Sequence, residues 1–166
     1  MSKSPINKSQ VHTMAKHQLV RQNSLTLYLR VRYSECDAQG VVFNARYADY
    51  ADLAATEYLR ALIGDYSELQ KHGFENQVVS YHIDWNRAAV FDDVLSITVS
   101  TTHVGNTSFQ FSLECSKRAD KAWQTVANIS ITYVCVCAKS FEKQAIPTWL
   151  ENAFAKSFSR SVNQAG

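Results

Sequence analysis

Asp37 is the residue whose type and position are best suited to chemistry in this chain. It lies in an acidic turn from Glu35 to Gly40, between a strand-like run and an amphipathic helix expected from Ala45 to Ile63. A carboxylate just before a helix can act as a base or a nucleophile, and the first backbone N–H groups of that helix have no partners within it. Attack and stabilisation of negative charge could therefore take place at one junction.

Other reactive side chains fit catalysis less well. Cys36 lies beside Asp37, but no local pattern pairs it with a histidine as a nucleophile. His82 and His103 fall within expected strands, where hydrogen-bonded structural histidines are common. We therefore interpret these three residues as structural.

The cysteines do not show the spacing of a metal site. Cys36 and Cys115 are isolated, and Cys135 and Cys137 are separated by one residue instead of the two to four that are typical of zinc sites. On a strand these last two thiols share a face and suit a core or an interface. We expect neither a metal nor any other cofactor.

A strand and a long helix flank Asp37. Leu25 to Tyr33 alternates apolar and polar residues, which predicts a strand that ends just before the acidic turn. From Ala45 to Ile63, apolar residues recur in steps of three and four and form one stripe on a helix. Asn44 is a candidate N-cap of this helix, and Gly64 is a candidate stop.

Four further strands are expected after the helix, over residues 78–86, 94–103, 108–116 and 122–137. Turn residues at 105–106 and 119–121 favour antiparallel connections between neighbours. One helix followed by successive strands indicates an α+β fold with a sheet of about five strands. After Pro147, the spacing of Trp149, Leu150, Phe154 and Phe158 predicts a helical tail over residues 148–166.

Composition narrows the possible functions. The chain has 166 residues, 46% of them hydrophobic and 19% charged, with a net charge of +2, as expected of a single globular domain. Residues 1–24 contain four basic residues and no acidic ones, which predicts a flexible basic leader. The remaining 13 basic and 15 acidic residues offer no broad basic surface for nucleic acid. Without about 20 consecutive apolar residues, no membrane span is expected, and we predict a cytoplasmic protein.

The motif around Asp37 resembles the signature of the 4-hydroxybenzoyl-CoA thioesterase family. Asp37, Gly40 and the run from Asn44 to Tyr47 match it, and similar stretches follow at Asp84–Ala89 and Phe91–Leu95. The resemblance covers about residues 25–147. It implies a single hotdog fold, in which a curved antiparallel sheet wraps a long central helix, and it implies an acyl-CoA thioesterase that releases a free acid and coenzyme A.

The resemblance also implies roles for individual residues. Asp37 would attack the thioester carbonyl or activate water, and the sequence leaves both routes open. The backbone N–H of Asn44 would stabilise the oxyanion, a contribution typically worth about 3 kcal/mol. Gly40, Phe43, Tyr47 and Arg87 would contact the substrate, with Arg87 near the phosphates of coenzyme A.

Related enzymes suggest alternatives that the sequence disfavours. A clade that uses a helix glutamate carries a His-Gly-Gly element, which this chain lacks, so Glu57 is interpreted as a solvated or paired helix residue. Hotdog hydratases carry a histidine where this chain has Val42. A non-catalytic acyl-CoA binder or partner-interaction protein is the second hypothesis. Because one hotdog leaves a sheet edge and part of its pocket unfinished, we expect a homodimer or homotetramer.

Overall fold

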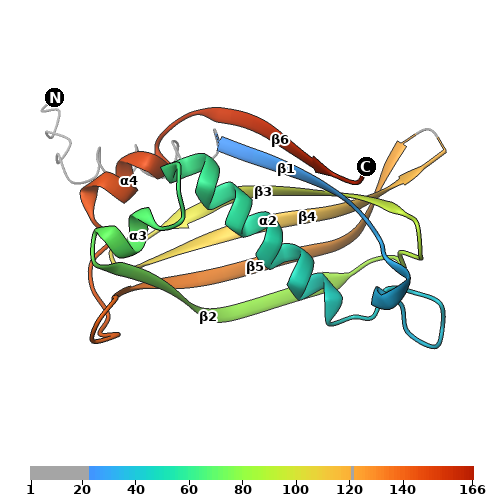
Figure 1. Cartoon of the computed structure of the whole chain (residues 1–166), viewed down its shortest axis with the longest axis horizontal. Helices are drawn as coiled ribbons and strands as arrows, with labels where there is room; N and C mark the ends of the chain where they lie inside the picture. The colour runs from blue at the N-terminus through green and yellow to red at the C-terminus, as the bar shows by residue number, and fades with distance from the viewer. Residues whose placement is uncertain (1–22, 121) are drawn as a thin grey trace, which may run out of the picture.

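A long helix, α2 (Arg46–Ile63), lies across one face of a six-stranded sheet (Figure 1). The computed structural model describes residues 23–120 and 122–166. The strands are β1 (Asn23–Arg30), β2 (Phe74–Trp85), β3 (Val94–Val104), β4 (Ser108–Ala119), β5 (Ala122–Cys137) and β6 (Phe158–Gln164), in the spatial order β2-β5-β4-β3-β1-β6. Short helical segments are η1 (Tyr33–Glu35), α3 (Glu68–Lys71) and α4 (Thr148–Phe154).

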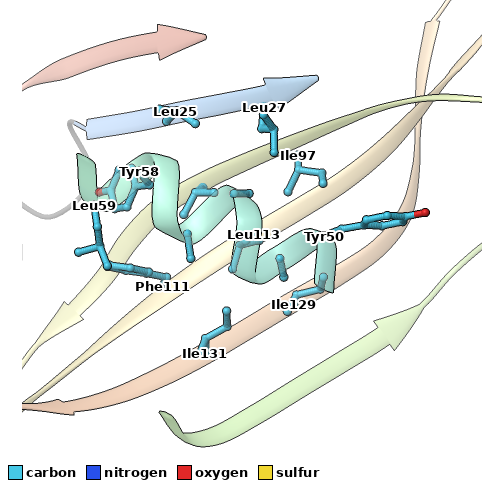
Figure 2. Close-up of a cluster of buried hydrophobic side chains, with 14 of the residues drawn as sticks. Leu25, Leu27, Tyr50, Tyr58, Leu59, Ile97, Phe111, Leu113, Ile129 and Ile131 are labelled. Atoms are coloured by element: carbon cyan, nitrogen blue, oxygen red, sulfur yellow. The ribbon is translucent and has the colours of Figure 1, made fainter. Parts of the chain in front are cut away.

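The apolar stripe of α2 packs into the core as its periodicity predicts. The eight residues of this helix that are buried are Tyr47, Tyr50, Ala51, Ala54, Ala55, Tyr58, Leu59 and Leu62. They face side chains such as Leu25, Ile97, Leu113 and Ile131 from four neighbouring strands (Figure 2). The small alanines allow the helix backbone to come close to the sheet, so α2 is held firmly along its length.

The C-terminal end of α2 agrees with the prediction, whereas its N-terminal end does not. Gly64 ends the helix, with φ of 92° and an N–H that donates to the carbonyl of Arg60 at 2.8 Å. The prediction of Asn44 as the N-cap was wrong by one residue. Ala45 occupies that position, and its methyl side chain has no acceptor that could cap the helix. A backbone turn from the Arg46 N–H to the Phe43 carbonyl (2.8 Å) leads into the helix instead.

All five expected strands are present, but most of their bounds differ from the prediction. The first, expected over residues 25–33, is β1 and ends at Arg30. β5 has the predicted bounds, and β3 and β4 begin at the predicted residues. β2 begins four residues earlier than predicted, at Phe74, since the long β5 continues to Cys137 and offers a backbone partner there. Pairing across the sheet thus adds residues that local sequence preferences did not mark.

The C-terminal tail departs from the prediction of helix over residues 148–166. α4 ends at Phe154, and β6 then pairs in parallel with β1, with Leu27 opposite Val162. Phe158 and Val162 pack against the core from one face of this strand. Their spacing of four suits a helix turn as well as a strand, and the open edge of β1 decides the outcome by offering backbone partners.

The predicted leader, residues 1–24, lies mostly outside the described residues. Asn23 and Ser24, which were assigned to it, belong to β1 instead. Among the helices of residues 23–120 and 122–166, none is both long and apolar enough to cross a membrane.

A buried polar network ties the C-terminal half of α2 to the sheet. The Tyr58 hydroxyl donates to Oδ1 of Asn23 at 2.7 Å, lies 2.8 Å from the Thr101 hydroxyl and accepts the Thr101 N–H at 3.1 Å. The Asn23 amide in turn donates to the Phe154 carbonyl at 2.7 Å. Every polar group in this network has a partner, as buried polar groups require.

Candidate active site

Asp37 lies in a small hairpin that joins η1 to the start of α2. Its N–H donates to the Val41 carbonyl at 2.9 Å, and Cys36 pairs with Val42 as an isolated bridge. The turn is closed by Gly40, whose N–H donates to the Asp37 carbonyl at 2.9 Å and whose φ is 77°. A glycine adopts this left-handed conformation without strain, which explains its place in the motif.

The carboxylate of Asp37 is half-buried and held on one side only. Its Oδ1 accepts the Gln39 N–H at 2.8 Å, the usual geometry of an aspartate in a turn. Within the described part of the chain, no donor reaches Oδ2. One oxygen therefore fixes the orientation of the carboxylate, and the other is free to meet a substrate or a water molecule.

The start of α2 offers two backbone donors next to this hairpin. Phe43 donates its N–H to the Glu35 carbonyl at 2.9 Å, which holds the segment before Asn44 against the segment before Asp37. Among the residues described, no acceptor is present for the N–H groups of Asn44 and Ala45, both exposed. An anion placed here would find unpaired donors at the positive end of an 18-residue helix.

Glu35 and Tyr50 brace the hairpin, a contribution that the sequence motif did not reveal. Oε2 of Glu35 accepts the Arg32 N–H at 2.7 Å and the Tyr50 hydroxyl at 2.8 Å. The Tyr50 hydroxyl projects from the N-terminal end of α2, away from the core cluster (Figure 2). Burial and the Glu35 carboxylate both raise the pKa of Tyr50, so its hydroxyl remains a donor.

The segment after β2 flanks the hairpin and brings Arg87 near it. The Ala89 carbonyl accepts the Val42 N–H at 2.8 Å, and Val90 forms a bridge with Val41. Arg87, two residues earlier, is exposed and donates from Nη1 to the Thr125 carbonyl at 3.2 Å. Its remaining guanidinium donors are available to an anionic ligand.

The other predicted substrate contacts differ in exposure. Phe43 is exposed beside the helix start, and Gly40 lies on the surface of the turn. Tyr47, in contrast, is 2% exposed and packs edge-on against Tyr50, with ring centroids 6.0 Å apart. Burial raises the pKa of its phenol to about 12. The structure thus places Tyr47 beneath the site, as a packing residue of the single chain.

Two of the rejected candidates, Glu57 and His82, have partners outside the hairpin. Glu57 is 17% exposed, forms an ion pair with Arg60 and borders a small hollow beside β6. It sits 11 positions after the first residue of α2, about 16 Å along the axis. His82 is exposed on β2 and pairs with Asp84 at 3.1 Å. Within residues 23–120 and 122–166, no three His, Cys, Asp or Glu side chains gather as metal ligands would.

Comparison with protein families assigns the chain to one of them. A profile described as the thioesterase superfamily matches residues 39–124, which is more than half of the chain. The chain belongs to the thioesterase superfamily. The match begins two residues after Asp37 and includes Gly40, Asn44 and Arg87. It confirms the predicted family and, with the sheet wrapped around α2, the predicted hotdog fold.

Curated relatives support this assignment. The acyl-CoA thioesterase YbgC of Haemophilus influenzae is 28% identical over 133 residues, 80% of this chain and 95% of the relative. The acyl-CoA thioester hydrolase YbgC of Escherichia coli O6:H1 is 29% identical over 120 residues, 72% of this chain and 87% of the relative.

Solved structures share the fold. A 1,4-dihydroxy-2-naphthoyl-CoA thioesterase from Synechocystis superimposes with a TM-score of 0.71 at 20% identity, covering 81% of this chain and 97% of that one. A mutant of 4-hydroxybenzoyl-CoA thioesterase in complex with 4-hydroxybenzoyl-CoA gives a TM-score of 0.72 at 20% identity, covering 78% and 97%.

Proposed function

We propose that this chain is an acyl-CoA thioesterase in which Asp37 carries the chemistry. The observation that supports this most directly is the half-buried Asp37 carboxylate, with one oxygen free, in a hairpin that leads into the unpaired N–H groups of Asn44 and Ala45. A thioesterase needs these two functions together, a nucleophile or base and a donor for the oxyanion. Relatives that are named as acyl-CoA thioesterases over most of this chain support the substrate class.

Two routes satisfy the geometry. In the first, Oδ2 of Asp37 bonds to the carbonyl carbon, the C–S bond breaks to release coenzyme A thiolate, and water then hydrolyses the acyl-aspartyl anhydride. In the second, Oδ2 takes a proton from water while the water oxygen attacks the carbonyl carbon, and the same C–S bond breaks. In both routes the negative charge on the carbonyl oxygen is stabilised by the Asn44 N–H, which is typically worth about 3 kcal/mol of barrier.

Substrate contacts follow from the surface around the hairpin. Arg87 offers charge-assisted hydrogen bonds to a phosphate of coenzyme A. The exposed rings of Phe43 and Phe91, with Tyr33 packed edge-on against Phe91 at 5.8 Å, offer apolar contact. Gly40 permits close approach of the ligand to the turn. For Tyr47, burial supports an indirect role, in which it supports the helix start instead of touching the ligand.

The test is hydrolysis of a panel of acyl- and aroyl-CoA esters by the purified protein, followed by free thiol release. Turnover of at least one ester is expected, and it should not depend on added metal. Binding of these esters without thiol release would support the alternative, a non-catalytic acyl-CoA-binding protein.

We further propose that two chains pair through β2, as a homodimer or within a homotetramer. β2 is an edge strand with unusual exposure of apolar side chains, among them Val79 at 59% and Trp85 at 52%. Burying such surface together with free backbone groups favours association. Mass and hydrolysis should be measured on the same diluted samples, where activity should fall with dissociation. A fully active monomer would contradict this proposal. The cytoplasmic location stays a prediction.

A further inference from the structure

A second hollow lies on the face of the sheet opposite α2. Leu25, Leu27 and Leu29 of β1 point into the core, so the alternate residues Tyr28 and Arg30 lie on the other face. There they border an open cavity of about 600 Å³. The other lining residues are Val94, Arg118, Trp123, Ser161, Asn163, Ala165 and Gly166. None of them belongs to the candidate active site.

The β4–β5 hairpin builds this hollow by bending over the sheet. Trp123 on β5 and Tyr28 on β1 are separated by β4 and β3, a distance of about 14 Å for three strand spacings. Their ring centroids are nevertheless only 5.8 Å apart, with the rings tilted by 41°. A bulge between Cys115 and Ser116 shifts the register where the hairpin bends. The hairpin leaves the sheet beside the C-terminal end of β6 (Figure 1), and Arg118 and Trp123 border the same hollow as Ala165.

Two arginines give the hollow a positive character, and they are not equivalent. Arg30 is anchored, because Nη1 contacts Oδ1 of Asp92 at 3.1 Å and Nε donates to the Ala165 carbonyl at 3.1 Å. Arg118 lies opposite Trp123 in the β4–β5 pairing, and no carboxylate among the described residues pairs with it. An exposed aromatic ring and an uncompensated guanidinium therefore lie side by side.

We propose that this hollow binds a nucleotide, with the base stacked on Trp123 and a phosphate held by Arg118. Aromatic rings stack bases without regard to sequence, and a guanidinium matches two phosphate oxygens with parallel hydrogen bonds. Ser161 and Asn163 supply polar groups along the β6 wall. The volume lies within the range of small-molecule sites. This binding site goes beyond the proposed thioesterase activity and does not depend on it.

The test uses ADP as the probe and measures its dissociation constant by calorimetry, on the full chain. Trp123→Ala should weaken ADP binding about tenfold or more, the loss expected for one stacked base. Arg118→Gln should weaken it to a similar degree through the lost charged hydrogen bonds. Circular dichroism checks that each variant folds. If Trp123→Ala does not fold, Arg118→Gln still tests the proposal, because Arg118 is exposed and its substitution should leave the fold intact.

Arg160→Gln is the matched control. Arg160 is an exposed β6 arginine that lies over the Phe158 ring at 5.8 Å and borders the hollow beside α2 instead. ADP should bind this variant as it binds the unaltered chain. Absence of ADP binding to the unaltered chain would overturn the proposal. So would Trp123→Ala and Arg118→Gln variants that bind ADP as tightly as the unaltered chain, or inorganic phosphate that binds as tightly as ADP.

The nucleotide could be free or could be the adenosine end of the acyl-CoA substrate. If it belongs to the substrate, Arg118→Gln should raise KM for an acyl-CoA ester and leave KM for the matching acyl-pantetheine, which lacks the nucleotide, unchanged. If it is free, Arg118→Gln should weaken ADP binding and leave both KM values unchanged. ADP binding is measured without turnover. Its result therefore tests the nucleotide site even if the chain proves not to be a thioesterase.

Discussion

The two halves of α2 handle polar groups in opposite ways. Around Tyr58, in the C-terminal half, one hydroxyl is buried among Asn23 and Thr101 with every partner in place. At the N-terminal end, the N–H groups of Asn44 and Ala45 are exposed and have no acceptor in the described chain. The hydrogen bonds around Tyr58, near the C-terminal end of α2, thus stabilise the folded state, whereas the unpaired N–H groups of Asn44 and Ala45 at its N-terminal end can still donate hydrogen bonds to a ligand.

The largest effect should come from Asp37→Asn. The amide keeps the size of the side chain but can neither attack a carbonyl nor take a proton, so kcat should fall by about 10²- to 10⁴-fold. Thermal unfolding should change little. The matched control is Glu57→Gln, which should leave the rate within about tenfold because Glu57 is paired with Arg60 away from the hairpin. Unchanged turnover by a folded Asp37→Asn variant would remove Asp37 from the mechanism.

Alkaline pH should reveal the buried tyrosines. Burial raises the pKa of Tyr58 from 10.0 to about 12, so folding favours the neutral phenol. The resulting stabilisation is complete below pH 10, and it is lost as the pH rises from about 10 to about 12. Two pKa units correspond to about 3 kcal/mol. Denaturant unfolding between pH 9 and 12 should show a smaller loss in Tyr58→Phe than in the unaltered chain, and parallel curves would contradict the assignment.

At neutral pH, Tyr58→Phe should lower the free energy of unfolding by about 1–3 kcal/mol, because Asn23 and Thr101 lose a buried partner. Specific activity of the folded variant should stay near that of the unaltered chain. Tyr33→Phe is the control, since this side chain is 81% exposed and its hydroxyl should contribute less than about 0.5 kcal/mol. Equal destabilisation by the two substitutions would show that the network adds nothing.

The smallest effect should come from Tyr50→Phe, which tests whether the hydrogen bond from Tyr50 to Glu35 holds the Asp37 hairpin in place. Glu35 keeps its bond from the Arg32 N–H, so the hairpin should loosen without unfolding. We expect kcat to fall less than tenfold with little change in KM, because Tyr50 acts through Glu35 and does not touch substrate. A purely structural role would lower stability, by about 1 kcal/mol, and leave kcat of the folded variant unaltered.

The sequence predicted the parts of the fold that are encoded locally. The stripe from Tyr47 to Leu62 has a helical period, and Gly64 supplies the conformation that ends a helix, so both predictions agree with the structure. β6 could not be predicted in this way, because the spacing of Phe158 and Val162 fits a helix turn too and the edge of β1 decided between them. Pairing over long sequence distance is a tertiary effect.

The candidate site was predictable to a similar degree. Asp37, Gly40 and the start of α2 are close in sequence, and the motif located all three. The bond between Glu35 and Tyr50 spans 15 residues, and no sequence motif links these two side chains. The hollow between Tyr28 and Trp123 depends on a bulge that bends a hairpin, which no local pattern marks.

The two edge strands of the sheet differ in chemistry, and this difference limits how many chains can join into one continuous sheet. One edge strand is β2, with 12 residues and exposed valine and tryptophan side chains. The other is β6, with seven residues and exposed Ser159, Arg160 and Ser161. Growth into a fibre requires strand pairing at both edges of the sheet. A short edge strand with polar side chains disfavours such pairing and so stops further addition of chains. We therefore expect self-limiting particles, whose scattering mass reaches a plateau as concentration rises; continued growth would show that β6 does not terminate the sheet.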